Sequence, residues 1–356
     1  MQNDALQTSF TNVLMQWNKT HNKRTMPWKG EKDPYKIWLS EVMLQQTRVE
    51  QGWPYFSRFI EHFPTIIHLA NAKDEAVFKL WEGLGYYSRC RNLLFTARYI
   101  AFELGGQFPH TYDELIKLKG VGPYSAAAIA SFAYNLPYAV VDGNVYRVIA
   151  RYLGINEPTD TNIGKKLFSE FANQLINRKQ PGTYNQAIMD FGATICKPAL
   201  PLCASCPLQH TCKALKAGVV HQLPVKLKSI QRKNRWMYYF VFTHQKKIGI
   251  LQRSNKDIWQ DLHEFYLVES NNMITWNAQS IKQWVKDQLN IIEFDIAKIS
   301  AMRKQQLTHQ QINGQFIHIA IDKIPEALQG LKWVNHQQIS QLAFPRFITA
   351  YFEEEG

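Results

Sequence analysis

Four of the five cysteines in this 356-residue chain fall within 17 residues, at the spacing C-x6-C-x2-C-x5-C. Four thiolates so close in sequence can enclose one metal centre, and soft sulfur ligands select zinc or an iron–sulfur cluster. Structural zinc sites usually have two short-spaced pairs, whereas only one such pair is present here, so a cluster is favoured over zinc. Prolines in the same segment indicate a tight loop, which argues against cysteines that are merely small buried residues. The candidate ligands are Cys196, Cys203, Cys206 and Cys212.

Two acidic residues, Glu41 and Asp142, stand in mostly apolar surroundings where a carboxylate could do chemistry. Glu41 lies in the helical pattern WLSEVML, and burial there would raise its pKa and let it carry a proton at neutral pH. A glutamate at the edge of that helix is the alternative. Asp142 follows the segment YAVV and precedes a predicted helix from Gly143. It is therefore expected to be a helix N-cap, a functional carboxylate, or both.

A glycine-containing turn, LKGVGP, joins two helical patterns at residues 118–123. Gly120 and Gly122 permit positive φ angles and a close approach of the backbone, and Pro123 suits the first position of a helix. The N–H groups at the start of that helix then point toward an anion such as a phosphate. Taken alone, the G-x-G pattern is also compatible with an ordinary turn.

The elements that must position these residues divide the chain into two parts. Helical periodicity dominates the first part and strand-like runs the second, and a basic segment without acidic residues separates them. We predict a helical domain over 1–215, a basic linker over 216–235 and an α+β domain over 236–356. The predicted helices are 35–51, 72–82, 90–104, 111–118, 124–134, 143–153, 163–176, 184–195 and 280–289; the predicted strands are 236–243, 248–253, 264–268 and 315–321.

The net charge of +12 indicates a polyanionic partner, nucleic acid before an anionic membrane surface. Residues 1–220 carry +7, residues 221–235 carry +5, and residues 236–356 are neutral. No apolar run reaches 18 residues and no secretory signal is seen, so a cytoplasmic, nucleoid-associated protein without a membrane partner is expected. In that reducing compartment the cysteines are not expected to form a disulfide framework.

These motifs together resemble the MutY-type adenine DNA glycosylases of the endonuclease III and helix-hairpin-helix superfamily. The cysteine loop follows a helix as it does in that family, LKGVGP resembles its hairpin, and DPYKIWLSEVMLQQTRVE matches its pattern nearly residue for residue. The resemblance is dense over 25–215 and loose over 236–345. It implies a mainly α N-terminal helix-hairpin-helix glycosylase domain, with the hairpin at about 111–134 and a 4Fe-4S loop at 196–212, and an α+β Nudix-like C-terminal domain.

The resemblance also implies a reaction. Glu41 would protonate the adenine base, and Asp142, fixed by Asn144, would stabilise the oxocarbenium-like sugar that forms as the N-glycosidic bond breaks. Tyr124 occupies the position where endonuclease III relatives carry a lysine that forms a Schiff base. A tyrosine cannot form that imine, so release of the base without strand cleavage is expected.

Further residues match the family's contacts to DNA and to the mispair. Gln46 would fill the space left by the extruded base, Thr47 and Tyr86 would lie near the opposing damaged guanine, and Gln186 would lie near the adenine pocket. Thr308 and His309 match a loop that recognises 8-oxoguanine, although Leu307 replaces the aromatic residue of that loop. The C-terminal domain lacks the acidic metal-binding pattern of Nudix hydrolases, so no pyrophosphohydrolase activity is expected.

Three hypotheses follow. The first is a monomeric adenine glycosylase with a 4Fe-4S cluster that acts on double-stranded DNA containing A:8-oxoG or A:G mispairs. The second is a glycosylase and lyase of the endonuclease III kind, which Tyr124 opposes. The third is a non-catalytic protein that binds duplex DNA through the cluster and hairpin, which the presence of both Glu41 and Asp142 opposes.

Overall fold

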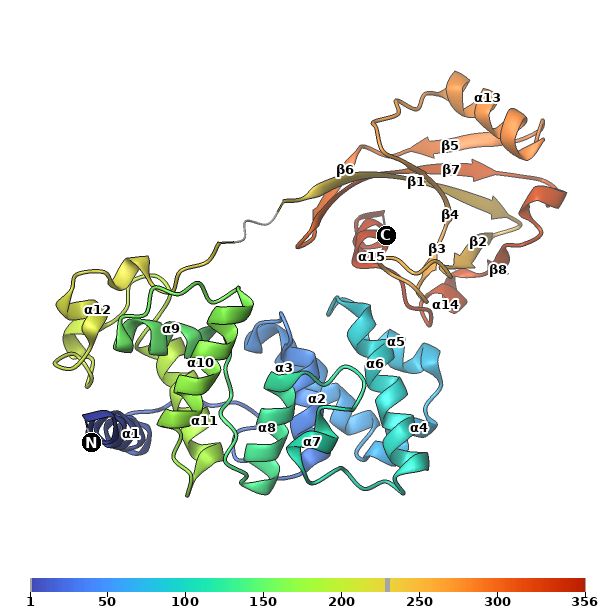
Figure 1. Ribbon diagram of the computed structural model, residues 1–356. Helices are drawn as coiled ribbons and strands as arrows, with labels where there is room; N and C mark the ends of the chain where they lie inside the picture. Colours follow the sequence, from blue (N-terminus) through green and yellow to red (C-terminus); the bar gives the residue numbers. More distant parts are fainter. Residues whose placement is uncertain (1, 228–230, 356) are drawn as a thin grey trace. The chain divides into compact units, whose positions relative to one another are not determined.

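The computed structural model describes residues 2–227 and 231–355, which fold into two compact units (Figure 1). One unit is Met1–Asn71 with Arg91–Lys228, and the other is Ala72–Cys90 with Ser229–Gly356. The second unit therefore contains a helical segment, 72–90, that the sequence placed in the first domain. Among the described residues, no helix is both long and apolar enough to cross a membrane.

The first unit is helical, and the helices that carry the predicted catalytic residues contribute side chains to its core. Buried side chains of α8, α9 and α11, such as Ala128, Ile149 and Phe191, pack with one another and with α1. The helices assigned to it are α1 (Gln2–Thr20), α2 (Pro34–Leu44), α3 (Val49–His62), α4 (Ile66–Asn71), α6 (Tyr87–Arg98, beginning in the second unit), the π-helical η1 (Tyr99–Glu103), α7 (Tyr112–Leu115), α8 (Pro123–Tyr134), α9 (Gly143–Leu153), α10 (Asn162–Leu175), α11 (Pro181–Thr194), η2 (Cys203–Ser205), α12 (Lys213–Lys216) and η3 (Val220–Gln222).

The longest predicted helix is wrong in extent. The pattern at 35–51 does not form a single helix, because α2 ends at Leu44 and α3 begins at Val49. Gln46 has a φ angle of 59°. A left-handed residue cannot continue a right-handed helix, so the chain turns there. The helices α1 and α4 were not expected from the sequence.

The second unit contains an eight-stranded mixed sheet in which β1 and β7 run parallel and side by side. The path of the sheet is β3-β2-β1-β7-β5, and β4, β6 and β8 pair with β1, β7 and β2. The elements are α5 (Asp74–Trp81), β1 (Lys233–His244), β2 (Lys247–Gln252), β3 (His263–Glu264), β4 (Tyr266–Ser270), α13 (Ala278–Leu289), β5 (Asp295–Ile299), β6 (Arg303–Gln306), β7 (Gln310–Ala320), η4 (Glu326–Leu328), β8 (Lys332–Val334), α14 (His336–Ile339) and α15 (Arg346–Glu355).

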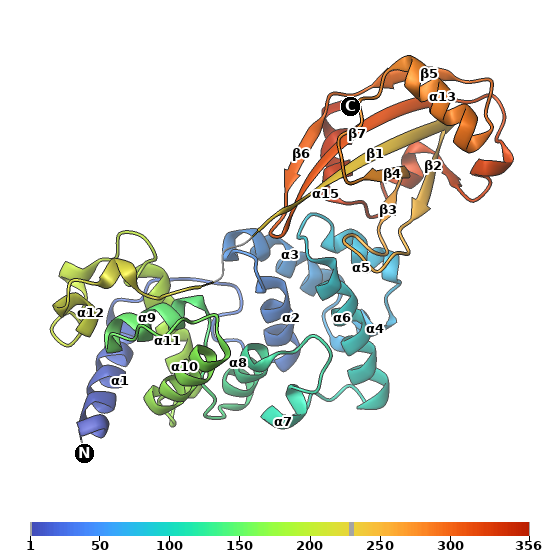
Figure 2. The same cartoon turned by 45° about the horizontal axis from the view of Figure 1, so that its top comes forward.

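Alternation along β1 gives this sheet two buried faces. Phe240 packs on Trp284 of α13, with ring centroids 4.6 Å apart, whereas the neighbouring Tyr239 stacks on Phe316, which in turn stacks on Tyr351 of α15. Both views show α13 and α15 on opposite sides of β1 and β7 (Figures 1 and 2). This α+β arrangement confirms the fold class predicted for the C-terminal part.

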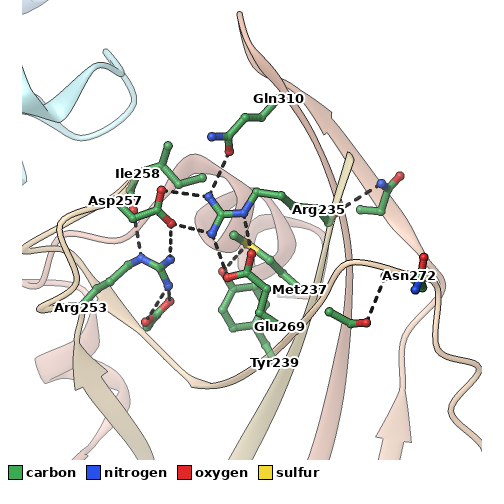
Figure 3. A network of polar contacts seen from close by, with 12 residues as sticks. Arg235, Met237, Tyr239, Arg253, Asp257, Ile258, Glu269, Asn272 and Gln310 are labelled. Atoms are coloured by element: carbon green, nitrogen blue, oxygen red, sulfur yellow. Dashed lines mark hydrogen bonds and ion pairs between the residues drawn. The ribbon is translucent and has the colours of Figure 1, made fainter. Parts of the chain in front are cut away.

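The basic linker differs from the expectation in one charge. Arg235 lies in β1 and forms ion pairs with Asp257 and Glu269 at 2.5 and 2.6 Å (Figure 3). Asp257 also pairs with Arg253. Burial opposes ionisation of Asp257, but hydrogen bonds from Arg235, the Ile258 N–H and Arg253 lower its pKa to about 2. The charge of Arg235 is therefore neutralised within the C-terminal unit, and Arg235 is not expected to bind the phosphate backbone of DNA. Lys228 of the predicted linker lies outside the described residues.

Candidate active site

Glu41 lies on the buried side of α2, at the wall of a pocket of about 200 Å³. Its side chain is 5% exposed, and its Oε2 atom has no hydrogen-bond partner within the described residues. Desolvation is the main cause that raises the pKa of this carboxyl, to about 7, and the nearby negative charge of Asp142 adds to it. Glu41 can therefore hold a proton at neutral pH and present it to a molecule in the pocket.

Tyr124 stands at the start of α8, one residue after Pro123, and its hydroxyl contacts the Glu41 carboxyl. The hydroxyl also lies 3.7 Å from the sulfur of Met189. Burial and the two neighbouring carboxylates raise the pKa of Tyr124 well above its usual range, so the phenol stays neutral. The position near both carboxylates is therefore occupied by a neutral hydroxyl and not by an amine.

Asp142 is the N-cap of α9 and a candidate functional carboxylate at the same time. Its Oδ1 accepts a hydrogen bond from the Val145 N–H at 2.8 Å, and its Oδ2 accepts one from the Asn144 side chain at 2.7 Å. Burial raises the pKa of Asp142, while these two donors and the charge of Arg147 oppose that rise. The N-cap interpretation is therefore confirmed, and the role as a functional carboxylate stays a prediction.

Arg147, which the sequence analysis did not single out, connects Asp142 to the cysteine loop. Its guanidinium donates to Asn144 Oδ1 at 2.8 Å, to the Gly192 carbonyl at 2.6 Å and to the Cys196 carbonyl at 2.7 Å. Asn144 is thereby held with its amide nitrogen toward Asp142. The orientation of the candidate carboxylate thus depends on α9, on α11 and on the segment that carries the first cysteine.

Gly192 of α11 lies directly against Asn144 of α9, which leaves no space for a side chain at position 192. A Cβ atom there would lie 2.7 Å from Asn144 Cβ and 3.0 Å from the Asn144 carbonyl oxygen. We predict that Gly192→Ala lowers stability by about 1–3 kcal/mol, the usual cost of overpacking, and also slows catalysis because it moves Asn144. Thermal unfolding and single-turnover rates measure the two effects. Gly218→Ala is a steric control because its Cβ would meet nothing within 4 Å, although its positive φ angle carries a cost of its own. Normal turnover in Gly192→Ala would contradict the role given to Asn144.

A buried acid that the sequence analysis missed holds two residues that line the pocket, Lys29 and Gln186. Asp190 of α11 is fully buried and pairs with Arg24 and Lys29, each at 3.0 Å. It also accepts hydrogen bonds from the side chains of Asn22 and Gln186. A carboxylate in the otherwise apolar run AIMDFGA was the signal that could have revealed it, because a buried charge requires partners.

The hairpin has the geometry expected of a backbone binding element. Gly120 has a φ angle of 82°, and a Cβ there would lie 2.8 Å from Asn92 Cβ. The Lys119 carbonyl accepts a hydrogen bond from Thr96, which fixes the turn. Gly122 is the N-cap of α8 without a side-chain cap, and a Cβ there would meet nothing. The first N–H groups of α8 are therefore reachable by an anion.

Tyr86 and Thr308, which the sequence places 222 residues apart, meet within the second unit. Their hydroxyl groups form a short hydrogen bond. Tyr86 is 39% exposed and has a left-handed φ angle of 50°. His309 is exposed beside Thr308, and its carbonyl accepts a hydrogen bond from the Lys233 N–H. Gln46 and Thr47 lie in the turn between α2 and α3 of the first unit.

Comparison with known proteins accounts for both units. Residues 39–173 match the HhH-GPD superfamily base excision DNA repair protein family, and residues 237–354 match the NUDIX domain family. The chain is 35% identical over 321 residues to the adenine DNA glycosylase of Buchnera aphidicola subsp. Baizongia pistaciae (strain Bp), which covers 88% of this chain and 87% of that protein. The chain belongs to the adenine DNA glycosylase family.

Other relatives of this glycosylase agree. The adenine DNA glycosylase of Mus musculus is 42% identical over 230 residues, covering 61% of this chain and 44% of that protein. The solved structure of a thermostable thymine-DNA glycosylase aligns with a TM-score of 0.56 and 26% identity, covering 60% of this chain and 98% of that chain. The predicted glycosylase fold, the Nudix-like domain and the assignment to DNA glycosylases are confirmed.

The four cysteines of the glycosylase line one cavity, beside Arg151, whose guanidinium lies 3.5 Å from Cys196 Sγ. Burial raises the pKa of Cys206 to about 11, and the three other thiols add to the rise, so the sulfur atoms lie near one another. Yet no three ligands among the described residues are arranged to hold a single metal ion. Four thiols around one cavity next to a cation are a donor set that suits a metal centre held by thiolates.

Proposed function

We propose that the protein removes adenine from duplex DNA where it lies opposite 8-oxoguanine or guanine, by acid-assisted hydrolysis of the N-glycosidic bond. The observation that carries the proposal is the buried Glu41, whose pKa is about 7, at the wall of a pocket and near Asp142. A base inside a duplex cannot reach such a pocket, so the target nucleotide must be extruded from the stack.

Glu41 is the proton donor in this proposal. In its protonated form it gives a proton to a ring nitrogen of adenine, which makes the base a better leaving group. Gln186 contributes to base selection, because Asp190 can only accept hydrogen bonds and therefore takes the amide nitrogen of Gln186. The Gln186 oxygen is then the end that accepts a hydrogen bond from the amino group of adenine.

Asp142 stabilises the positive charge that develops on the sugar as the bond breaks. The hydrogen bonds from Val145 and Asn144 keep its charged form oriented before the reaction, so little reorganisation is needed in the transition state. After adenine leaves, Glu41 is ionised and can accept a proton from the attacking water. The product is an abasic site in an intact strand.

Tyr124 supports a monofunctional reaction. Strand cleavage by β-elimination requires an amine that forms a Schiff base with the opened sugar, and a phenol cannot do this. The neutral hydroxyl instead contacts Glu41 and orients its carboxyl. The lyase hypothesis therefore lacks its nucleophile at this position.

Recognition of the opposite base is assigned to the second unit. Tyr86 and Thr308 present a pair of hydroxyl groups, and the exposed His309 lies beside them. The hairpin at Gly120 and Gly122 binds the phosphate backbone, which gives affinity without sequence information. In the first unit, Gln46 fills the space of the extruded base, and Thr47 contributes a contact near the opposing guanine.

One assay separates the proposal from its alternatives. The protein is incubated with a duplex that contains adenine opposite 8-oxoguanine, and strand breaks are measured with and without later alkali. Breaks only after alkali support the proposal. Breaks without alkali indicate a lyase, and no breaks in either case indicate a protein that only binds the duplex.

We also propose that Cys196, Cys203, Cys206 and Cys212 hold a 4Fe-4S cluster. When bound, the cluster supplies a rigid cross-link for the loop, and its ligands must be deprotonated thiolates. Arg151 donates to the Lys197 and Pro198 carbonyls at 2.7 and 3.1 Å while facing Cys196, so it both shapes the loop and offsets negative charge.

We predict that protein purified anaerobically is brown and contains four iron atoms per chain, with a broad visible absorption band. Cys206→Ser should lower the iron content and destabilise the loop, because a thiolate ligand is lost. Cys90→Ser is the matched control, since Cys90 is buried apart from the loop. Metal analysis and visible spectra test this, and a colourless protein with one zinc per chain would refute the cluster.

A further inference from the structure

Lys79 of α5 and Glu82, which follows that helix, fasten the segment 72–90 to a C-terminal strap formed by residues 342–344. Glu82, just after α5, accepts a hydrogen bond from the Phe344 N–H at 2.8 Å through Oε1. The Lys79 ammonium donates to the Leu342 carbonyl at 3.0 Å and to Glu82 Oε2 at 2.7 Å. Both carboxylate oxygens of Glu82 are thus used, and its side chain is only 18% exposed.

The strap itself is anchored in the core of the C-terminal unit. The Ala343 carbonyl accepts a hydrogen bond from the His263 N–H of β3 at 2.8 Å. Phe344 is 1% exposed and packs against Phe265 and Phe352, with ring centroids about 6 Å apart. Lys79 and Glu82 are therefore tied to a fixed part of the fold rather than to a loose surface loop.

The chain leaves this attachment directly into the turn that ends at Tyr86. Gly83, Gly85 and Tyr86 all have positive φ angles. The turn is closed by the Trp81 indole, which donates to the Gly85 carbonyl at 3.0 Å, and by Arg89, whose guanidinium lies over the Tyr86 ring. A non-glycine residue in the left-handed region is strained, so surrounding contacts must hold it there.

We propose that Lys79 and Glu82 form a latch that holds the Tyr86 hydroxyl against Thr308, and that Glu82 is thereby a positioning residue for the preference of 8-oxoguanine over guanine opposite adenine. The inference rests on the proposed function, which gives Tyr86 and Thr308 the contact to the opposite base. Tyr86 is far from Thr308 in sequence, and the latch fixes the start of its turn on the same unit that carries Thr308.

The physical consequence is a preorganised pair of hydroxyl groups. When the turn is already fixed, Tyr86 loses little conformational entropy as the lesion binds. The affinity for the lesion is therefore higher than it would be with a mobile Tyr86. Guanine offers fewer contacts to the pair than 8-oxoguanine does. Loosening the latch should therefore affect the damaged pair more than the undamaged one.

The experiment uses the full chain and measures single-turnover rates on duplexes with adenine opposite 8-oxoguanine and opposite guanine. Glu82→Ala and Lys79→Met are expected to lower the ratio of the two rates about tenfold, the size associated with one charge-assisted hydrogen bond. The rate opposite guanine should change little. Glu82→Gln should retain most of the preference, because its amide oxygen can still accept from the Phe344 N–H.

Glu75→Ala is the matched control, since it removes an exposed carboxylate from the same helix. Hydrogen exchange provides a readout that does not depend on activity: Glu82→Ala should speed exchange at Phe344 and at residues 83–87. If Glu82→Ala fails to fold, Lys79→Met carries the same test. Equal losses on both duplexes, or an unchanged ratio while exchange is faster, would overturn the latch.

Tyr86→Phe and Thr308→Val distinguish this inference from the proposed function. If they change the ratio while both latch variants leave it unchanged, the latch is wrong and the recognition assignment stands. If neither pair of variants changes the ratio, the recognition assignment is wrong, and the role of the latch in specificity is wrong as well.

Discussion

Replacement of Glu41 by Gln is expected to slow adenine release by about 10²- to 10⁴-fold, the range associated with loss of a general acid. Glutamine has nearly the same size as glutamate but has no proton to give and cannot later accept one. The residue is buried at the pocket wall, so binding to duplex DNA should persist. Single-turnover rates and gel-shift binding on the same duplex measure both effects.

The raised pKa of Glu41 sets the pH dependence of the reaction. The protonated form is the active one, so the rate of adenine release should fall as pH rises through about 7. Glu41→Gln should remove this limb from the residual activity. Glu61→Gln, at an exposed carboxylate of α3, should keep both the rate and the pH profile of the unmodified protein. A rate that does not change between pH 6 and pH 8 would contradict the acid role.

The same raised pKa also predicts that stability falls as pH rises. Between the unfolded pKa of about 4.5 and the folded pKa of about 7, the folded protein binds the proton more tightly, so its stability falls as pH rises through this window. A shift of this size corresponds to about 3 kcal/mol. Glu41→Gln should therefore be more stable than the unmodified protein above pH 7 and similar to it near pH 4.5, as measured by denaturant unfolding.

Replacement of Asp142 by Asn is expected to lower adenine release by at least about 10²- to 10³-fold, the range found when one preorganised electrostatic contact is lost. Asparagine caps helices as well as aspartate does, so α9 and the stability of the fold should be nearly unchanged. The charge that faces the developing cation is lost. Loss of activity without loss of stability is therefore the distinguishing result, measured by single-turnover rates and thermal unfolding.

Two further variants make this test sharp. Asp142→Ala removes both the charge and the cap, and should cost about 1 kcal/mol of stability in addition to the activity. Asp33→Asn makes the same change at the N-cap of α2, where the carboxylate accepts from the Tyr35 N–H, and should leave catalysis intact. Turnover of Asp142→Asn close to that of Asp33→Asn would show that Asp142 is only a cap.

Local sequence patterns were sufficient for much of the helical unit. Helix α9 was predicted with its observed bounds, because a capping aspartate at its start and Gly154 after its end mark them. The long helix at 35–51 was wrong, since the apolar pattern continues through Gln46 while the backbone there is left-handed. Periodicity reports which side chains can be buried and carries no information on such a turn.

The strands β5, β6 and β8 could not be predicted because they are short, and β6 consists only of polar residues. They exist because β7 and β2 offer backbone groups for pairing. Asp190 was missed for a related reason. Its partners Arg24 and Lys29 are more than 160 residues away, so no local pattern links them.

The sequence by itself determined the chemistry available: two carboxylates, a tyrosine where a lysine would allow strand cleavage, and four cysteines at a distinctive spacing. Those are properties of residue types and local spacing, which chain order preserves. The tertiary structure decided their state. Burial beside Asp142 raises the pKa of Glu41. Ion pairs with Asp257 and Glu269 remove Arg235 from the free positive charge of the linker. The attachment of Lys79 and Glu82 brings Tyr86 to Thr308. Each depends on desolvation or on contacts between distant segments, which only the folded chain creates.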